Sequence, residues 1–296
     1  GGAGPKTVHG EFRDLSSGNV LSTLDQVTLD QQAPSAALAL GASTYGPLSW
    51  PGAVSGAVAD DGPAGVARVE VSLLRQATHY WNGAAWQAGA FWVAVEAVGG
   101  AWVLPLAAAD LAGGTSYLVR CRAVDRAGNE QAQPDEAGFT FDAEAPTGSF
   151  SIGAGQPAAT GSRSVVLAMA VSGAAEMSFC NAGAPWSDWE TVAATRDWQL
   201  LGGDGEKRVY GRFRDGVGNL LEVSDTILLD SVAPTAALVL APTAGPQTWG
   251  GLLGGTASDN AGGSGVARVE VQCGRASDGA FWDGAGWVAG EVWLAA

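Results

Sequence analysis

The sequence predicts an all-β chain built from tandem antiparallel sandwiches in an extended rod, and two observations carry this prediction. Along most of the chain, apolar and polar residues alternate with a period of two between Gly, Pro, Asn and Asp residues, and no stretch shows a sustained helical period. The chain also repeats itself after 200 residues, since the segment GVARVEV occurs at 65–71 and again at 265–271. A repeat of this kind indicates a tandem array of structural units.

The first complete unit, which we call the long-type segment, is predicted to span residues 34–143. Its strands are placed where the alternation is strongest, and its turns where Gly, Pro and Asp interrupt it. The predicted strands lie near 36–41, 52–58, 65–74, 78–82, 91–96, 101–106, 115–124 and 137–142.

The second complete unit, the short-type segment, is predicted to span residues 144–232. Its predicted strands lie near 148–152, 163–171, 176–182, 188–192, 196–200, 207–215 and 223–230. Successive side chains of a strand point to opposite faces, so Val209, Gly211 and Phe213 are expected to face the core. Val8 and Phe12 repeat this pattern near the N-terminus.

The two ends of the chain match parts of these units. Residues 1–33 match the C-terminal part of the short-type segment, and residues 233–296 match the N-terminal part of the long-type segment. At each junction a strand closes with Asp and Ala-Pro follows shortly after, as with Asp30 and Ala33-Pro34. Because proline fixes φ and ends the hydrogen-bond ladder, we expect short, stiff junctions and hence an extended rod.

The last hairpin of each unit carries the motif Asp-x-x-Gly-Asn, at 125–129 and 215–219, with a form one residue longer at 14–19. Asp accepts backbone N–H groups at the start of a turn, and Gly and Asn tolerate positive φ. The motif therefore predicts a hairpin turn that needs no ligand.

These motifs carry a resemblance to a known family. The stretch 212–219, followed by 224–230 and Ala233-Pro234-Thr235, resembles the bacterial and archaeal Ig-like repeats of large cell-surface and secreted proteins. The stretch 177–198 resembles the middle of the same repeats, and 81–92, echoed at 282–293, resembles a companion repeat. The resemblance covers essentially the whole chain and implies tandem Ig-like sandwiches with an extracellular or cell-surface location. It leaves the function open, because such repeats occur in adhesins, stalks, sheaths and enzyme-borne spacers.

The charge balance excludes one class of partner. The chain has 15 lysine and arginine residues against 30 aspartate and glutamate residues, a formal net charge of −15. Nucleic-acid binding needs clustered Lys and Arg, so no nucleic-acid partner is expected, whereas divalent cations are attracted. No stretch approaches 18 consecutive apolar residues, so we expect no membrane insertion in this segment.

Calcium is a candidate cofactor. Calcium needs six to eight oxygen ligands, and a junction between sandwiches could bring together acids from a linker, a loop and a hairpin. The candidate metal-binding residues are Asp30, Asp142, Asp230, Asp60, Asp61, Asp259, Asp125 and Asp215. Against this hypothesis, each junction offers a single linker acid.

The 12 tryptophans are the second candidate feature. Aligned exposed rings bind sugars, so the two Trp hairpins could form a site for cell-surface glycans or for lateral contacts. The alternative, which the recurrence of the pattern favours, is that the rings fold over the sandwich edge and stabilise strand pairing. The candidate ligand-binding residues are Trp81, Trp86, Trp92, Trp282, Trp287 and Trp293, and Trp249 is a further ring whose exposure would support a sugar site.

Catalysis and disulfide formation find little support. The two histidines, His9 and His79, lie in no repeated motif with a Ser or Cys partner, so we do not expect an enzyme. Cys121, Cys180 and Cys273 fall in three different repeats, which argues against a disulfide framework. Cys121 and Cys273 are expected in the core and Cys180 at the surface.

The sequence therefore predicts a structural extracellular repeat segment of a much longer surface, sheath or filament-forming protein. Its expected partners are further repeats of the same chain or copies of itself. One alternative is an adhesive or carbohydrate-binding module that uses the Trp hairpins. A second is a filament protomer in which the part-repeats 1–33 and 234–296 of neighbouring copies complete each other by strand exchange. The lengths argue against the second, because strand 101–106 would have no counterpart.

Overall fold

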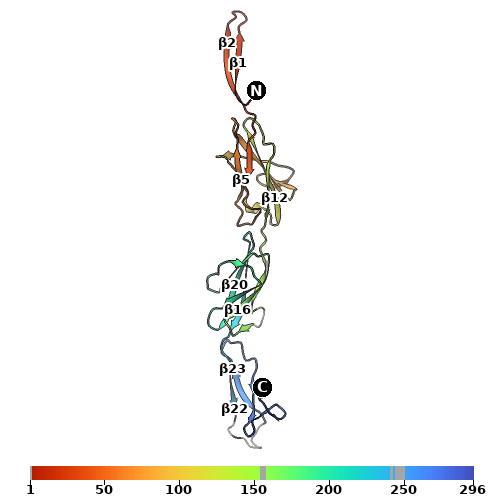
Figure 1. Ribbon diagram of the computed structural model, residues 1–296, viewed down its shortest axis with the longest axis vertical. Coiled ribbons are helices and arrows are strands. Elements are labelled where there is room, and N and C mark those ends of the chain that lie inside the picture. The colour runs from red at the N-terminus through yellow and green to blue at the C-terminus, as the bar shows by residue number, and fades with distance from the viewer. Residues whose placement is uncertain (1, 154–157, 241–242, 244–250) are drawn as a thin grey trace. The chain divides into compact units, whose positions relative to one another are not determined.

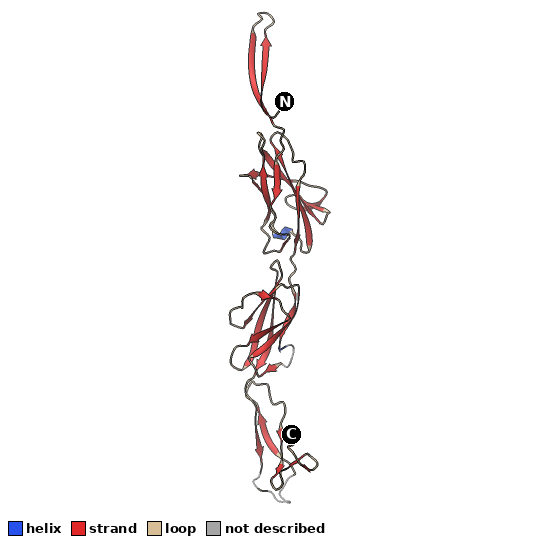
Figure 2. Cartoon of the chain, viewed as in Figure 1, coloured by secondary structure: helices blue, strands red, loops and turns tan. Residues whose placement is uncertain are grey.

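The computed structural model describes residues 2–153, 158–240, 243 and 251–296. The chain divides into two compact units, Gly1–Pro146 with Arg214–Leu220, and Thr147–Phe213 with Leu221–Ala296. The described residues form mainly β-strands, and the 3-10 turn η1 (Ala108–Asp110) is drawn in blue in Figure 2. The all-β prediction is confirmed. No helix in this described part of the chain has the length and apolar composition of a membrane span.

The N-terminal residues form a two-stranded antiparallel hairpin, β1 (Gly4–Arg13) and β2 (Val20–Leu29), drawn in red in Figure 1. The expectation that Val8 and Phe12 face a core is not met, since their exposed fractions are 59% and 63%. Their counterparts Val209 and Phe213 are fully buried. The difference arises because the short-type segment supplies a second sheet that covers this face, and residues 1–33 contain no counterpart of that sheet.

The long-type segment contains two facing sheets. The first has the strand order β10-β11-β5-β3, and the second has the order β4-β13-β12-β6-β7-β8, with β9 also paired to β6. The strands of the first sheet are β3 (Ser35–Leu38), β5 (Ala53–Ala59), β10 (Ala97–Val98) and β11 (Ala101–Pro105). Those of the second are β4 (Thr44–Tyr45), β6 (Val66–Arg75), β7 (His79–Trp81), β8 (Trp86–Ala88), β9 (Val93–Val95), β12 (Thr115–Asp125) and β13 (Asp135–Phe141). Each of the eight predicted strands is present; β4, β8 and β10 were not predicted.

The inner faces of these two sheets form one apolar core. Val54 and Trp102 come from the first sheet, and Val71 and Tyr117 from the second. Gly56 makes room for the Trp102 ring, because a Cβ at position 56 would lie 2.7 Å from it. The packing of large apolar side chains between the sheets is the main stabilising contribution to this segment.

The short-type segment has the same two-sheet design. One sheet has the order β14-β16-β19, and the other has the order β15-β21-β20-β17-β18. The strands are β14 (Thr147–Ile152), β15 (Ala159–Thr160), β16 (Ser164–Ser172), β17 (Glu176–Asn181), β18 (Glu190–Thr191), β19 (Thr195–Gln199), β20 (Gly205–Arg214) and β21 (Leu220–Leu229). All seven predicted strands are found, and β15 is additional.

The predicted orientation of β20 is confirmed. Val209, Gly211 and Phe213 are buried, and a Cβ at Gly211 would lie only 2.9 Å from the Phe150 ring. In this core the Phe179 ring contacts the rings of Phe150 and Phe213 edge to face. Glycine at position 211 therefore lets the aromatic rings approach the strand closely.

The cysteines follow the predictions in part. Cys121 is fully buried, and Cys273 is half-buried. The prediction that Cys180 is exposed is wrong, since only 6% of it is accessible. The side chains of Arg212 and Glu222, joined by a hydrogen bond of 2.6 Å, lie close enough to Cys180 to influence its thiol electrostatically. Such long, paired side chains on neighbouring strands cover the outward face of β17.

Residues 233–296 contain β22 (Thr235–Val239), β23 (Gly254–Ser258), β24 (Glu270–Val271), β25 (Gly274–Arg275), β26 (Ala280–Trp282), β27 (Trp287–Val288) and β28 (Leu294–Ala295). The pairing of β24 with β28 reproduces the register of β6 with β9, since Glu270 faces Ala295 as Glu70 faces Ala94. The sequence repeat is thus also a repeat of strand pairing.

Candidate metal centre

Three of the predicted metal-binding residues converge in the structure. Asp30 follows β2, Asp60 follows β5, and Asp125 ends β12. One carboxylate oxygen of each lies within 4.8 Å of the others. Asp30 and Asp125 are buried, with exposed fractions of 7% and 2%, and Asp60 is half-buried.

Backbone groups hold the Asp30 carboxylate in a fixed orientation. Its Oδ1 accepts a hydrogen bond from the Gln32 amide at 2.9 Å, and its Oδ2 accepts one from the Ala64 amide at 2.8 Å. A Cβ at Gly62 would lie 2.5 Å from Asp30 Oδ2, so the loop after β5 closes over the carboxylate only because residue 62 is glycine.

Asp125 is held by Asn129 of its own hairpin. The Asn129 backbone amide donates to Asp125 Oδ1 at 2.8 Å, and Asn129 Nδ2 donates to Oδ2 at 2.7 Å. Burial by itself raises the pKa of Asp125, but these hydrogen bonds outweigh it and keep the pKa below the ordinary value. Asp125 is therefore ionised at neutral pH.

Asp60 provides the least satisfied atom of the cluster. Its Oδ1 accepts a hydrogen bond from the Gly62 amide at 2.8 Å, whereas its Oδ2 is buried and has no hydrogen-bond partner. Among the ion pairs found in the described residues, none includes any of the three aspartates. Three carboxylates this close repel one another, and a buried unpaired oxygen is unfavourable, so the arrangement fits a bound cation.

The chemistry of these donors suits a hard divalent cation. The hydrogen bonds that orient Asp30 leave a lone pair on each of its oxygens, and Asp60 Oδ2 has no hydrogen-bond partner. Calcium accepts such carboxylate oxygens together with backbone carbonyls and water. The three aspartates could thus supply half of a calcium coordination shell.

The hairpin motif has a role that the sequence did not reveal. Besides binding Asp125, Asn129 Nδ2 donates to the carbonyl oxygens of Asp30 and Gln32, each at 3.3 Å. The last hairpin of the long-type segment is thereby tied to the linker that precedes that segment. The recurrence of Asn in the motif was the available signal, since turn formation alone does not require its side chain.

The same linker contact recurs at the next junction. Asn219 Nδ2 donates to the Asp142 carbonyl at 3.1 Å and to Asp215 Oδ2 at 2.8 Å. Asp215 Oδ1 in turn accepts three backbone amides of its own turn, from Val217 to Asn219. Among the described residues no third acid joins Asp142 and Asp215, so these two predicted ligands serve the hairpin and the linker instead.

The third junction contains an amide between its acids. Asp230 Oδ2 accepts hydrogen bonds from the Ser264 amide and hydroxyl, both at 2.7 Å, and mainly these bonds lower the pKa of Asp230. In the amide orientation that satisfies both of its ends, Asn260 Nδ2 donates to Asp230 Oδ1 at 3.2 Å and to Asp259 Oδ1 at 2.8 Å. An NH₂ group here bridges two carboxylates that would otherwise repel. Asp61 is exposed and lies outside the cluster.

The Trp hairpin of the long-type segment packs against its own sheet. Trp81 is buried beside Trp86, with ring centroids 5.4 Å apart, and Trp86 Nε1 donates to the Asp110 carbonyl at 2.7 Å. Arg75 lies 4.9 Å from the Trp86 ring centroid. The guanidinium of Arg122 likewise lies 4.7 Å from the Trp92 ring. Sequence reasoning missed these cation–π contacts, because the arginines come from other strands.

The second Trp hairpin is more open. The rings of Trp282 and Trp287 lie 5.7 Å apart, and Arg275 lies 4.7 Å from the Trp287 ring. Trp287 is exposed, and Trp293 is exposed to 58%. Trp249 lies outside the described residues. Among the six predicted ligand-binding tryptophans, Trp287 and Trp293 have the largest exposed fractions.

Comparison with known proteins gives likenesses in structure alone. No family model and no curated protein matches the sequence. A Ca²⁺-stabilized adhesin that helps an Antarctic bacterium reach out and bind ice matches at 16% identity and a TM-score of 0.42, over 80% of this chain and 60% of its own. A tetra-tandem repeat in the extending region of a large adhesion protein matches at 20% identity and a TM-score of 0.29. This match covers 80% of the present chain and 58% of the other protein. Fibronectin(III)-like modules of Clostridium thermocellum CbhA match at 12% identity and a TM-score of 0.36. This match covers 66% of the present chain and 93% of the other protein. The chain thus spans about three fifths of the first two proteins, and likenesses of such low TM-score do not bear on its own fold or function.

Proposed function

We propose that this chain is a structural repeat segment of a longer extracellular or cell-surface protein, in which it acts as a stiff spacer. The observation that carries the proposal is the recurring linker contact. The side-chain amide of Asn129 donates to the carbonyl oxygen of Asp30, and that of Asn219 donates to the carbonyl oxygen of Asp142. Each of these aspartates lies in the linker before the segment that carries the asparagine. A hydrogen bond from a folded hairpin to the linker restrains the linker backbone, and the proline that follows restrains it further. Repeated restraint at successive junctions is what a spacer requires.

The two complete sandwiches have separate apolar cores, which supports a mechanical role. Each core can unfold without exposing the other, so a pulling force is resisted in successive steps.

Single-molecule force spectroscopy on the full chain tests this function. A long-type segment of about 110 residues releases roughly 36–40 nm of contour length when it unfolds, less its folded length, because an extended residue spans 3.3–3.6 Å. We expect separate unfolding events for the two complete segments. A single event for the whole chain, or extension without force peaks, would contradict the spacer function.

We further propose that the cluster of Asp30, Asp60 and Asp125 binds calcium and stiffens the first junction. The support is the 4.8 Å grouping of three carboxylates and the buried, unpartnered Asp60 Oδ2. A ligand that binds only the folded state stabilises it by RT ln(1 + [L]/Kd), so calcium at 100 times its Kd adds about 2.7 kcal/mol. Thermal unfolding in EDTA and in CaCl₂ tests this, and equal melting temperatures would remove the calcium proposal while leaving the spacer proposal intact.

A glycan-binding function is the second candidate, favoured by the exposure of Trp287 and Trp293. Binding of a sugar to either ring would change its fluorescence, so titration with common polysaccharides tests it. An unchanged tryptophan spectrum, with the Trp293→Ala variant as control, would count against this candidate.

A further inference from the structure

The first strand of the long-type segment, β3, is held by hydrogen bonds along both of its edges. On one edge it pairs antiparallel with β5, and just after its end the Ala39 amide donates to the Ser55 carbonyl at 2.9 Å. Its other edge ends the sheet, because β3 is the last strand in the order β10-β11-β5-β3. At this edge the side chains of Gln131 and Asp135, from the last part of the segment, bind the β3 backbone.

The side-chain amide of Gln131 binds β3 as a neighbouring strand would, because it offers both an acceptor and a donor. Its Oε1 accepts a hydrogen bond from the Ala36 amide at 2.6 Å, and its Nε2 donates to the Ala36 carbonyl at 3.2 Å. Gln131 is itself fixed to β12 in the opposite sheet, since its backbone amide donates to the Ala123 carbonyl at 3.0 Å. Gln131 thus fastens the first strand of one sheet to the other sheet.

Asp135 adds a third bond at the same edge. It is the first residue of β13, and its Oδ2 accepts a hydrogen bond from the Leu38 amide at 2.8 Å. Ala36 and Leu38 alternate with the residues that bond to β5, so their amides point to the edge of the sheet. We call the three bonds that Gln131 and Asp135 make to β3 the strand lock.

The chain that follows β3 is also bonded to β13. There β4 pairs parallel with β13. The Thr140 amide donates to the Ser43 carbonyl at 2.9 Å, and the Asp142 amide donates to the Tyr45 carbonyl at 2.8 Å. Because β4 and β13 run in the same direction, a pull on the chain before β3 and an opposite pull on the chain after β13 slide these strands past each other.

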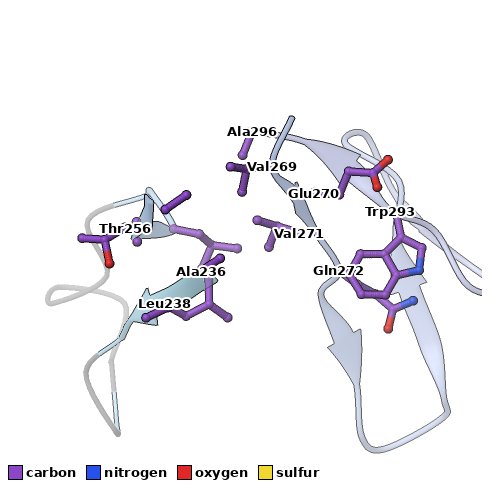
Figure 3. A pocket seen from close by; sticks show the side chains of 14 residues that line it. Ala236, Leu238, Thr256, Val269, Glu270, Val271, Gln272, Trp293 and Ala296 are labelled. Atoms are coloured by element: carbon purple, nitrogen blue, oxygen red, sulfur yellow. The ribbon is translucent and has the colours of Figure 1, made fainter. Parts of the chain in front are cut away.

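The core contacts of β3 oppose such sliding less than its hydrogen bonds do. Ala36 is buried in the apolar core, and the same strand face recurs in residues 233–296, where Figure 3 shows Ala236 and Leu238 facing Val269 and Val271. Apolar contacts have no directional preference, so they resist separation of the surfaces more than movement along them. A hydrogen bond is lost after a displacement of about 1 Å, because its distance and angle are confined to narrow ranges.

The short-type segment repeats this arrangement at its own first and last strands. β15 pairs parallel with β21, as β4 does with β13. Oδ2 of Asp225, a residue of β21, accepts a hydrogen bond at 2.8 Å from the amide of Ile152, the last residue of β14. Like β3, β14 is an edge strand of its sheet. In both complete segments a carboxylate of the last strand therefore binds a backbone amide of the first strand.

We propose that the strand lock and the β4–β13 pair bear the load when the chain is pulled, and that the strand lock sets the force at which the long-type segment unfolds. This inference rests on the proposed spacer function and names the residues that bear the load in it. The bonds of the lock and of the β4–β13 pair join the same two ends of the segment. Sliding therefore loads them together, instead of breaking them one after another.

Single-molecule force spectroscopy on the full chain tests the strand lock with the double variant Gln131→Ala/Asp135→Ala. The long-type segment is recognised by its larger release of contour length, because it has more residues than the short-type segment. We expect a lower unfolding force for the long-type segment and an unfolding rate at least about tenfold faster, because three hydrogen bonds are lost. The unfolding force of the short-type segment should not change.

Single variants at Asp135 keep the test valid if the double variant does not fold, because Asp135 is exposed. Asp135→Ala should lower the force, and Asp135→Asn should restore it, since asparagine keeps an oxygen for the Leu38 amide. Glu136→Ala is the matched control, because it removes a carboxylate that pairs with Arg120 outside the lock. Asp225→Ala should lower the force of the short-type segment alone.

A core variant separates mechanical from general stability. Val71→Ala weakens the buried core without touching the lock, so it should lower the unfolding force less than Asp135→Ala does for an equal loss of stability in urea. An unchanged long-type force in the lock variants, or an equal loss of force in Glu136→Ala, would overturn the strand lock. Separate unfolding events would then persist and keep the spacer function, whereas their absence in the wild type would contradict the spacer function itself.

Discussion

Replacement of Asp60 by Asn should have opposite effects with and without calcium. In EDTA the change removes one of three mutually repelling carboxylates. Two unit charges 4.8 Å apart repel by about 3.5 kcal/mol at an effective dielectric constant near 20, and Asp60 takes part in two such pairs. Because Asp60 is half-buried and solvent screens its charge, we expect a smaller gain of about 1–3 kcal/mol.

The chain itself contains a precedent for this stabilisation. At the third junction Asn260 Nδ2 bridges Asp230 and Asp259, although the strand register aligns Asp259 with Asp60 and Asn260 with the next residue, Asp61. An asparagine at position 60 keeps an oxygen for the Gly62 amide, and its NH₂ group replaces the unpartnered Oδ2. In calcium the same variant loses a ligand, so its free energy of unfolding should fall below that of the wild type.

Differential scanning calorimetry in EDTA and in CaCl₂ measures both effects. A change of 1 kcal/mol corresponds to about 4 °C in Tm for a domain near 100 residues, so the expected shifts are about 4–12 °C. Asp61→Asn is the matched control, because it makes the same charge change at an exposed neighbour outside the cluster. A loss of stability of Asp60→Asn in EDTA, or an undiminished response of this variant to calcium, would refute the reasoning.

Three further predictions concern the linker, the thiols and acid stability. Asn219→Ala removes the bond to the Asp142 carbonyl, so hydrogen exchange in the linker should accelerate, and stability should fall by about 1–2 kcal/mol; unchanged exchange would contradict the linker contact. Burial raises the pKa of the Cys121 thiol to about 12, so iodoacetamide at pH 8 should modify half-buried Cys273 first, and mass spectrometry of native protein can check the order. Burial alone would raise the pKa of Glu70, but Arg68 and Arg122 hold it below the ordinary value of 4.5. Glu70 therefore stabilises the fold above about pH 4.5, and this contribution is lost as the pH falls through the lowered pKa. Urea unfolding of Glu70→Gln from pH 3 to 7 should show a weaker pH dependence than that of the wild type.

The strands of the two complete segments were predictable because alternation is a local property. A strand such as β20 shows its inward and outward residues in its own sequence, and burial of Val209 and Phe213 follows once any sheet covers them. The missed strands, β4, β8, β10 and β15, have only two or three residues. Such short strands exist only because a neighbouring strand pairs with them, so no periodicity marks them.

The candidate site was predictable as a set of residue types but not as a constellation. Of eight aspartates singled out, Asp30, Asp60 and Asp125 converge, although they are separated by 30 and 65 residues in the chain. Asp230 and Asp259 are instead bridged by the side-chain amide of Asn260, and Asp215 accepts backbone amides of its own turn. Likewise, the arginines that lie against Trp86 and Trp92 come from other strands, Arg75 from β6 and Arg122 from β12, and only the sheet brings them to the rings.

The sequence by itself determined the fold class, the repeat and the strands, because side-chain periodicity and turn chemistry act between residues close in the chain. Only the tertiary structure decided which acids share a site, that Cys180 is covered, and that Asn129 and Asn219 hold the linkers. These features depend on distances between residues far apart in the chain, and such distances are set by the packing of one sheet against another.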